Sequence, residues 1–177
     1  MEFLQVLEGR HSIRKFDSRP VPKELLEELV RSAALAPTAS NLQAWRFFVL
    51  TDPELVHKVD LFSPGLSGKP PVIVAIASDF SEVARRGSEN SKVYGCMMDA
   101  SMAAENLMLR ATDLGLGTCA IKSYNDAAVR KLLRLPEWMR LELLISVGYP
   151  AGEPRAPQRK SMEQVLFWNE WKEDSHA

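Results

Sequence analysis

The stretch DASMAAENLMLRATDLGLGTCAIKSY, residues 99–124, sets the architecture of this chain. Its first half belongs to an apolar, methionine-rich segment, residues 92–114, whose composition predicts a long helix. A turn at Gly115 follows, and residues 116–121 then predict a strand. A long helix joined by a glycine turn to a strand indicates a fold in which helices and strands are mixed.

The predicted helix at residues 92–114 has almost no polar side. Its apolar positions are Met97, Met98, Ala100, Met102, Ala103, Ala104, Leu107, Met108, Leu109 and Ala111. A helix that is apolar all round must be covered all round, either by layers of its own chain or by a second copy of the chain. A chain of 177 residues can do this alone only with layers on every side, so we favour the second copy and expect a homodimer.

Further elements are predicted on both sides of this stretch. Amphipathic patterns predict helices at residues 2–8 and 22–35. Short apolar runs bounded by turn residues predict strands at residues 46–50, 72–77 and 143–147. The chain has no internal repeat, so we interpret residues 1–177 as a single domain of mixed α and β structure. Its Pro- and Arg-rich tail, about residues 152–177, is expected to form an extended arm.

The composition argues against several functional classes. A net charge of −1 and a pI near 6.3 give no field that would attract nucleic acid or an anionic membrane. No apolar run approaches the roughly 20 residues that span a bilayer, and the N-terminal MEFLQVLEGR lacks the features of a signal peptide. We therefore expect a cytoplasmic protein that binds a small molecule, with neither nucleic acid nor a membrane as partner.

The two cysteines, Cys96 and Cys119, lie far apart in the sequence. This spacing indicates neither a disulfide framework nor a metal or redox pair. We expect both to be small buried side chains, and no metal site is predicted.

A basic cluster, RHSIRKF, begins at Arg10 in a chain whose charges are otherwise balanced. Arg10 and Arg14 are four residues apart, with the Ser12 hydroxyl between them. Arginine side chains match phosphate oxygens with paired hydrogen bonds, so the cluster can hold an anion. A solvated basic turn is the alternative. Arg159, near the other end of the chain, either completes such a site or belongs to a charged arm.

A polar loop, PTASNLQAW, begins at Pro37. Thr38, Ser40, Asn41 and Gln43 all donate or accept hydrogen bonds, and amides match the alternating carbonyls and nitrogens of an isoalloxazine ring. A capped turn between helix and strand is the alternative. Taken with the basic cluster, the loop suggests a phosphorylated cofactor.

These segments, in this order, resemble the FMN-dependent nitroreductases over essentially the whole chain. Four blocks carry the resemblance: RHSIRKF, APTASNLQAWRFFVL, the stretch quoted first, and LISVGYPAGEP followed by RKSMEQV. The chain departs from the family pattern at four positions. Ala39 stands where a serine is common, and Ala44 replaces the usual proline. Lys122 and Ser123 stand where larger relatives often have an acidic residue and a glycine.

The resemblance implies a nitroreductase-like α+β fold, with a central, mostly antiparallel sheet flanked by helices. It also implies an intertwined homodimer that binds FMN at the subunit interface, with NADH or NADPH as co-substrate. By the resemblance, Arg10, Ser12 and Arg159 hold the FMN phosphate and ribityl chain, and Arg14 approaches the pyrimidine side of the ring. We expect His11, beside the phosphate, to be an orienting donor, with proton delivery as the alternative. The full implied set is Arg10, His11, Ser12, Arg14, Pro37, Thr38, Ala39, Asn41, Gln43, Ala120, Ile121, Lys122, Ser123 and Arg159.

The activity implied is hydride transfer through flavin N5 to a nitroaromatic or a quinone by a ping-pong mechanism. No side chain is expected to act as a catalyst, because main-chain N–H groups of Lys122 and Ser123 would face N5. Same-scaffold enzymes that break down flavin, remove halogen or oxidise azolines are alternatives, as is an FMN-binding module without activity. The sequence does not specify the acceptor, the preferred nicotinamide, the role of oxygen as an acceptor, or the roles of Lys69 and Lys122.

Overall fold

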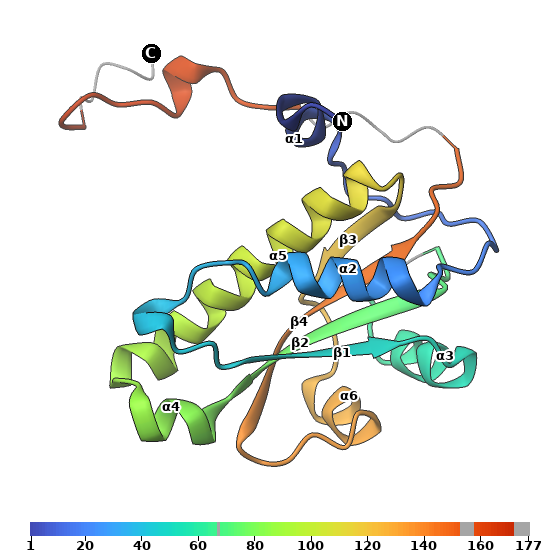
Figure 1. Cartoon of the computed structure of the whole chain (residues 1–177), viewed down its shortest axis with the longest axis horizontal. Helices are drawn as coiled ribbons and strands as arrows, with labels where there is room; N and C mark the ends of the chain where they lie inside the picture. The colour runs from blue at the N-terminus through green and yellow to red at the C-terminus, as the bar shows by residue number, and fades with distance from the viewer. Residues whose placement is uncertain (67, 153–157, 172–177) are drawn as a thin grey trace.

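The computed structural model describes residues 1–66, 68–152 and 158–171. Helices and strands alternate through most of the chain (Figure 1). Their order is α1 (Phe3–Gly9), α2 (Lys23–Ala33), the 3₁₀ turn η1 (Ala39–Asn41), β1 (Trp45–Leu50), α3 (Pro53–Leu61), β2 (Val72–Asp79), α4 (Phe80–Arg86), the π-helical turn η2 (Ser91–Gly95), α5 (Cys96–Asp113), β3 (Gly117–Ile121), α6 (Asp126–Leu132), β4 (Met139–Gly148) and the 3₁₀ turn η3 (Met162–Gln164). Each helix and strand predicted from the sequence is present.

The four strands form one antiparallel sheet in the order β1-β2-β4-β3. β2 pairs with β1 on one side and with β4 on the other, and β3 completes the sheet by pairing with β4. The predicted α+β class with a central, mostly antiparallel sheet is therefore confirmed. β1 and β3 form the two edges of this sheet.

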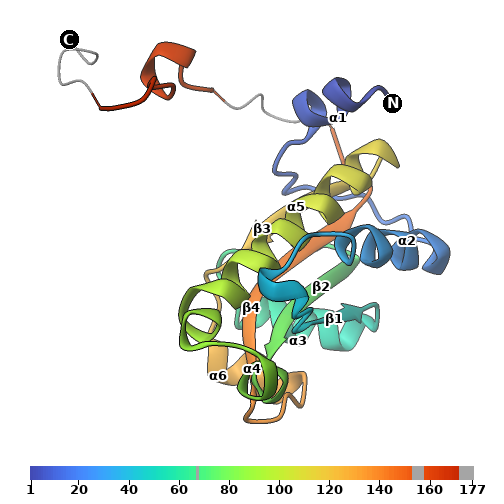
Figure 2. The ribbon, with the colours of Figure 1, turned by 60° about the vertical axis from the view of Figure 1, so that its left-hand side comes forward.

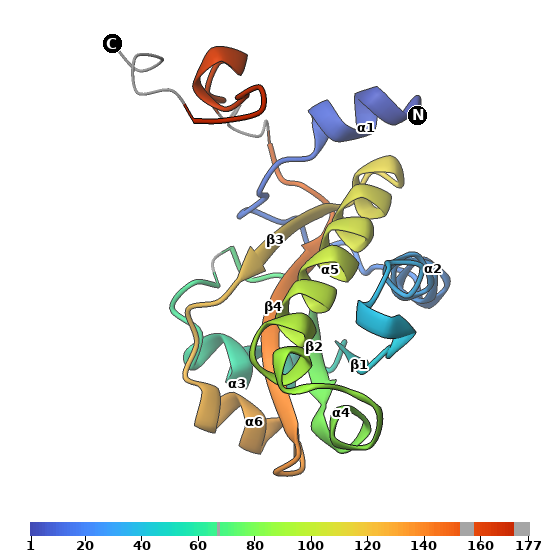
Figure 3. The same cartoon turned by 90° about the vertical axis from the view of Figure 1, so that its left-hand side faces the viewer.

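The inner strand β2 is buried along its whole length, which explains its unbroken apolar run VIVAIA. Successive side chains of a strand point to opposite faces of the sheet. Val72, Val74 and Ile76 pack with α2 and α5, whereas Ile73 and Ala75 pack with α3 and α6. Figure 3 shows these two pairs of helices on opposite sides of the sheet.

The long helix α5 is buried on one side only. Its buried residues are Cys96, Asp99, Ala100, Ala103, Ala104, Leu107, Met108 and Ala111. Met97, Met98 and Met102, by contrast, are exposed. α2 packs beside α5 (Figure 2), but no layer of the described residues covers these three methionines. The arrangement in which a single chain buries this helix on every side is therefore wrong.

Three short helices, α3, α4 and α6, were not predicted from the sequence. Each begins with a side chain that caps the helix: Asp52 accepts from the Glu54 N–H, Asp79 from the Ser81 and Glu82 N–H groups, and Asn125 from the Ala128 N–H. Helices of seven to nine residues show few apolar repeats, so these capping residues are the sequence signal that could have located them.

The C-terminal segment, residues 158–171, lies outside the body of helices and strands in all three ribbon views, and almost all of it is exposed. The rest of the predicted arm beyond residue 152 falls outside the described residues. Cys96 and Cys119 are both buried and free, as expected. No helix in the described part of the chain is long and apolar enough to cross a membrane.

Candidate cofactor site

The basic segment lies along the β3 edge of the sheet. The N–H of Ile13 donates to the Thr118 carbonyl at 2.8 Å, and Ser12 forms a parallel bridge with the same residue. The side chain of Ile13 also lies directly over Gly117, where a Cβ atom would stand only 2.7 Å from it. The absence of a side chain at Gly117 therefore allows the basic segment to lie this close to β3.

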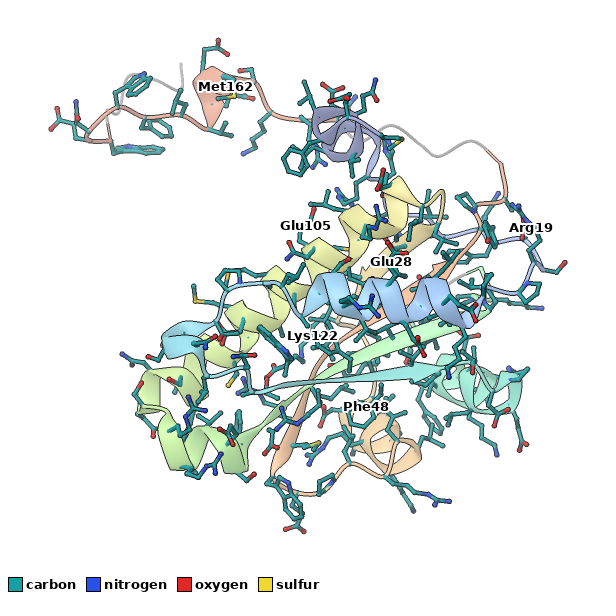
Figure 4. The ribbon with its side chains drawn as sticks, in the orientation of Figure 1. Arg19, Glu28, Phe48, Glu105, Lys122 and Met162 are labelled. Carbon is teal, nitrogen blue, oxygen red and sulfur yellow. The ribbon has the colours of Figure 1, made fainter. Side chains whose placement is uncertain are left out.

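The two arginines of this segment have different surroundings. The Nε atom of Arg10 lies 3.3 Å from a carboxylate oxygen of Glu105, the α5 residue labelled in Figure 4, and the Arg10 side chain is only 17% exposed. Arg14 is exposed and has no ion-pair partner within the described ranges. Because the contact with Glu105 uses Nε, the two terminal nitrogens of Arg10 remain as donors.

His11 adds an unsatisfied polar atom to the same segment. Its Nδ1 atom is buried and has no hydrogen-bond partner among the described residues, and the same holds for Oγ1 of Thr118 on the adjoining strand. Buried polar atoms are normally hydrogen-bonded in native structures. These two orphaned atoms next to the basic segment mark this edge of β3 as a candidate binding site.

The turn that begins at Lys122 leaves the sheet at the end of β3, whose last two residues are Ala120 and Ile121. The ladder between β3 and β4 ends at the pair Ile121 and Leu144, and Lys122 and Ser123 follow it as exposed residues. The Ser123 carbonyl accepts from the Gly65 N–H at 3.1 Å. The structure thus brings the basic segment and this turn to one edge of the sheet, with Gly65 beside Ser123 and Gly68 beside Arg14.

The side chain of Lys122 is held against the next strand. Its Nζ atom donates to the Glu142 carbonyl at 2.6 Å and to the Tyr124 hydroxyl at 3.2 Å. The Tyr124 hydroxyl donates in turn to the Leu141 carbonyl at 3.2 Å, and burial raises the pKa of this phenol. The ammonium group of Lys122 therefore fastens the turn to β4.

The polar loop that begins at Pro37 is held in an unusual conformation. Ser40, Asn41 and Gln43 all have a positive φ, between 50° and 54°. Within the loop, the Gln43 N–H donates to Thr38 Oγ1 at 3.2 Å, and its side-chain amide donates to Asn41 Oδ1 at 2.9 Å. Asn41 and Gln43 are exposed, so the side-chain amide groups that this pair leaves unused are available at the surface.

One helix separates the polar loop from the basic segment. The loop contacts α5 at Asp99, whose carboxylate accepts from the Ala39 N–H at 3.1 Å, whereas Arg10 contacts α5 at Glu105. Six helical residues correspond to about 9 Å along the axis and about 120° around it. Figure 1 shows the loop near the N-terminal end of α5 and α1 near its other end. A single chain therefore does not join the two predicted halves of the site.

The remaining predicted residues lie elsewhere. Arg159 is on the exposed C-terminal segment, and no hydrogen bond or ion pair joins it to residues 10–14 in the described part of the chain. Lys69 lines a groove of about 510 Å³ together with His57 and Asp60. This groove and two others, of about 790 and 650 Å³, contain none of the predicted cofactor-binding residues.

Comparison with known proteins identifies the family. The model of the Nitroreductase family matches two overlapping segments of the chain, residues 7–65 and 58–149. The chain belongs to the nitroreductase family. A protein of Archaeoglobus fulgidus with the provisional name NADH dehydrogenase/NAD(P)H nitroreductase is 32% identical over 161 residues, which is 86% of this chain and 87% of the relative.

Two further relatives of this nitroreductase-family chain differ in their named activities. The structure of an FMN-dependent nitroreductase from Clostridium difficile R20291 has a TM-score of 0.80 at 27% identity and covers 95% of this chain and 99% of that one. Human iodotyrosine deiodinase 1 is 25% identical over 196 residues, which is 93% of this chain and 68% of the relative. The resemblance inferred from the four sequence blocks is confirmed at the level of family and fold.

Sequence reasoning missed two acidic residues of α5 that contact the predicted site. Asp99 holds Ala39, and Glu105 pairs with Arg10. Both stand in a segment that is otherwise dominated by apolar residues. Asp99 is buried, and an isolated carboxylate in an apolar segment is the signal that could have singled it out, because a buried carboxylate needs a partner. Glu105 is exposed, so its position gave no such signal.

Proposed function

We propose that this nitroreductase-family chain is an FMN-dependent oxidoreductase. It transfers hydride from NADH or NADPH to an electron-poor acceptor, such as a nitroaromatic or a quinone, by a ping-pong mechanism. The observation that carries the proposal is that a cationic segment with an orphaned histidine nitrogen and an exposed main-chain turn lie at the same edge of the sheet. Family membership and the named relatives point in the same direction.

The residues at the β3 edge fit the phosphate end of FMN. We assign the terminal nitrogens of Arg10 and the hydroxyl of Ser12 to the phosphate and ribityl oxygens, with His11 as an orienting residue. Arg159 from the C-terminal segment is a further proposed phosphate partner. Charge-assisted hydrogen bonds of this kind contribute roughly 1.5 to 3 kcal/mol each, so two or three of them would retain a nucleotide.

The ring of FMN is assigned to the remaining residues. The chemistry that FMN supplies when bound is two-electron transfer between nicotinamide and acceptor. The fixed charge of Arg14 stabilises negative charge on the pyrimidine side of the ring. Main-chain N–H groups of Lys122 and Ser123 donate on the reactive side, next to Ala120 and Ile121. Pro37, Thr38, Ala39, Asn41 and Gln43 line the other edge.

A homodimer is part of the proposal because the two halves of the site lie apart in one chain. Loop 37–43 of one copy would complete the site at the β3 edge of the other. The exposed methionines of α5, together with Phe3, Leu4 and Leu7 of α1, provide apolar surface for such an interface. The C-terminal segment adds exposed Trp168 and Trp171 side chains, which suit an intertwined arrangement.

The visible absorption spectrum of the purified protein tests this function. A flavin spectrum that bleaches when NADPH or NADH is added without oxygen, and returns when a quinone or nitroaromatic is added, is the expected result. A bound flavin that neither nicotinamide reduces would reject the proposed reaction and leave an FMN-binding module. A colourless protein that does not take up added FMN would reject the flavin site itself.

The deiodinase relatives support a second candidate function, reductive removal of halogen from an aromatic ring. The same flavin protein would then act on a halogenated phenol. Iodide release from an iodinated tyrosine under reducing conditions, compared with turnover of a nitroaromatic at equal concentration, separates the two. Faster release of iodide would assign the chain to the second function.

A further inference from the structure

Asp99 differs from the other buried acidic residues in having no cation beside it. Three carboxylate side chains are buried in the described part of the chain: Asp79, Asp99 and Glu142. Asp79 lies 2.9 Å from Arg46, and Glu142 lies 2.9 Å from Arg140. Within the same residues, Asp99 has no ion-pair partner, and its carboxylate accepts only the N–H of Ala39, at 3.1 Å.

Packing alone does not explain an aspartate at this position. Asp99 is 5% exposed and stands on the buried side of α5 among apolar residues. Burial of a carboxylate without a cation destabilises the folded protein, and an apolar side chain of similar size would be less destabilising there. Burial raises the pKa of Asp99, while the hydrogen bond from Ala39 acts in the opposite direction. The one interaction that an apolar residue could not provide is the bond to the loop.

The loop that Asp99 holds needs an anchor. Ser40, Asn41 and Gln43 have a left-handed backbone although none of them is a glycine. This backbone conformation is strained for residues with a side chain, and it persists only where neighbouring groups fix the backbone. Ala39 comes directly before these residues, and Asp99 fixes its N–H to the central helix. Ala39 also lies against Gly95, where an added Cβ atom would stand 3.8 Å from the Ala39 Cβ.

We propose that Asp99 is a positioning residue, which holds residues 38–43 in the conformation that presents Asn41 and Gln43 to the cofactor. It acts through Ala39 and does not itself touch the ligand. This inference rests on the proposed function for the role of the loop, but the anchoring of the loop stands on the geometry of Asp99 and Ala39 alone. The polar side chains of the loop are then arranged before the cofactor arrives.

Three substitutions at one position test the proposal. Asp99→Asn keeps an oxygen that accepts from Ala39, whereas Asp99→Leu fills the same space without an acceptor. Asp99→Ala removes the acceptor without adding bulk and is measured in the same way if the leucine variant does not fold. Asp113→Asn is the matched control, because Asp113 is the other aspartate of α5 and pairs with the N-terminus and Arg110.

Two measurements are made on each full-length protein. Hydrogen exchange of the peptide that covers residues 37–45 reports whether the loop is held. Titration with FMN, followed by flavin fluorescence, reports the affinity. Wild-type protein with and without its bound flavin is the reference, so that loss of flavin and release of the loop can be told apart.

Asp99→Leu or Asp99→Ala is expected to speed exchange in the loop at least about tenfold beyond flavin-free wild type and to weaken FMN binding about tenfold or more. Asp99→Asn and Asp113→Asn are expected to stay near wild type in both measurements. Unchanged loop exchange in the folded leucine or alanine variant would overturn the proposal. Failure of the wild-type protein to bind FMN would instead reject the proposed function, and the exchange data would still decide the role of Asp99.

Discussion

The Nε atom of Arg10 lies 3.3 Å from a carboxylate oxygen of Glu105, so the basic segment is fastened to the central helix α5. The pair is partly exposed, and its Coulomb energy is correspondingly small. Its main effect is therefore positional. Glu105 orients the Arg10 side chain, and the negative charge of Glu105 also competes with any anion that Arg10 would bind.

Arg10→Ala is expected to weaken FMN binding at least about tenfold while the protein remains folded, because it removes a phosphate partner and not core packing. Glu105→Gln is the informative companion. Glu105→Gln removes the charge that competes for Arg10, so this variant should bind FMN as tightly as the wild type or a few times more tightly. Fluorescence titration with FMN measures both. Equal affinity of the Arg10→Ala variant and the wild type would remove Arg10 from the site.

The exposed methionines of α5 predict the position of the dimer interface. Met98 is 60% exposed, so Met98→Glu should leave the fold of one chain intact and dissociate the dimer. Leu61→Glu is the control, since Leu61 is 67% exposed on α3, across the sheet from α5. Sedimentation velocity distinguishes the species. A dimeric Met98→Glu variant, or a monomeric wild type, would contradict the proposed interface.

Leu107 is the wrong position for that test. Although the sequence pattern does not separate it from the methionines of the same helix, Leu107 is fully buried in the core of a single chain. Leu107→Asp is therefore expected to unfold the chain itself, with an unpaired charge in the core. Circular dichroism would show loss of helix together with loss of any flavin, and a folded monomer would contradict this expectation.

Gly117 should not tolerate a side chain. A Cβ atom there would stand 2.7 Å from three atoms of Ile13, so Gly117→Ala is expected to destabilise the protein by roughly 1 to 3 kcal/mol. It should also displace the basic segment and weaken FMN binding. Gly9→Ala is the matched control, because the nearest atom to its added Cβ lies 3.7 Å away. Urea unfolding compares the two, and equal midpoints would contradict the predicted clash.

Asp79 makes folding sensitive to acid. Burial of this carboxyl raises its pKa, but hydrogen bonds from Ser81 and Glu82 and the charge of Arg46 together hold the pKa below its usual value. A lowered folded pKa stabilises the protein above the unfolded pKa, and this contribution is lost as pH falls through the folded value. Asp79→Ala is expected to cost about 2 kcal/mol at neutral pH.

Urea unfolding of wild type and Asp79→Ala from pH 7 downwards checks this expectation. The difference in unfolding free energy should shrink below about pH 4, the usual range for an unfolded aspartate. Asp52→Ala removes a helix cap that has no ion pair among the described residues, and it serves as the control with a smaller expected loss of stability. A difference in unfolding free energy that stays constant with pH would show that folding does not lower the pKa of Asp79.

Sequence reasoning located the elements with strong periodicity. The apolar run of β2 and the amphipathic pattern of α2 are visible in the sequence because side chains repeat on a buried face. The short helices α3, α4 and α6 were missed because seven to nine residues give little periodicity, and their start depends on single capping residues such as Asp79.

The sequence by itself determined the family, the α+β class and the chemical type of each candidate segment, because those depend on residue identity and local order. Only the tertiary structure decided that Ser12 of the basic segment pairs with Thr118 of β3, that Lys122 binds β4, and that Asp99 accepts from Ala39. These contacts link residues 20 to 106 positions apart along the chain. They arise from the packing of α5 and the strand order of the sheet, which no local pattern encodes.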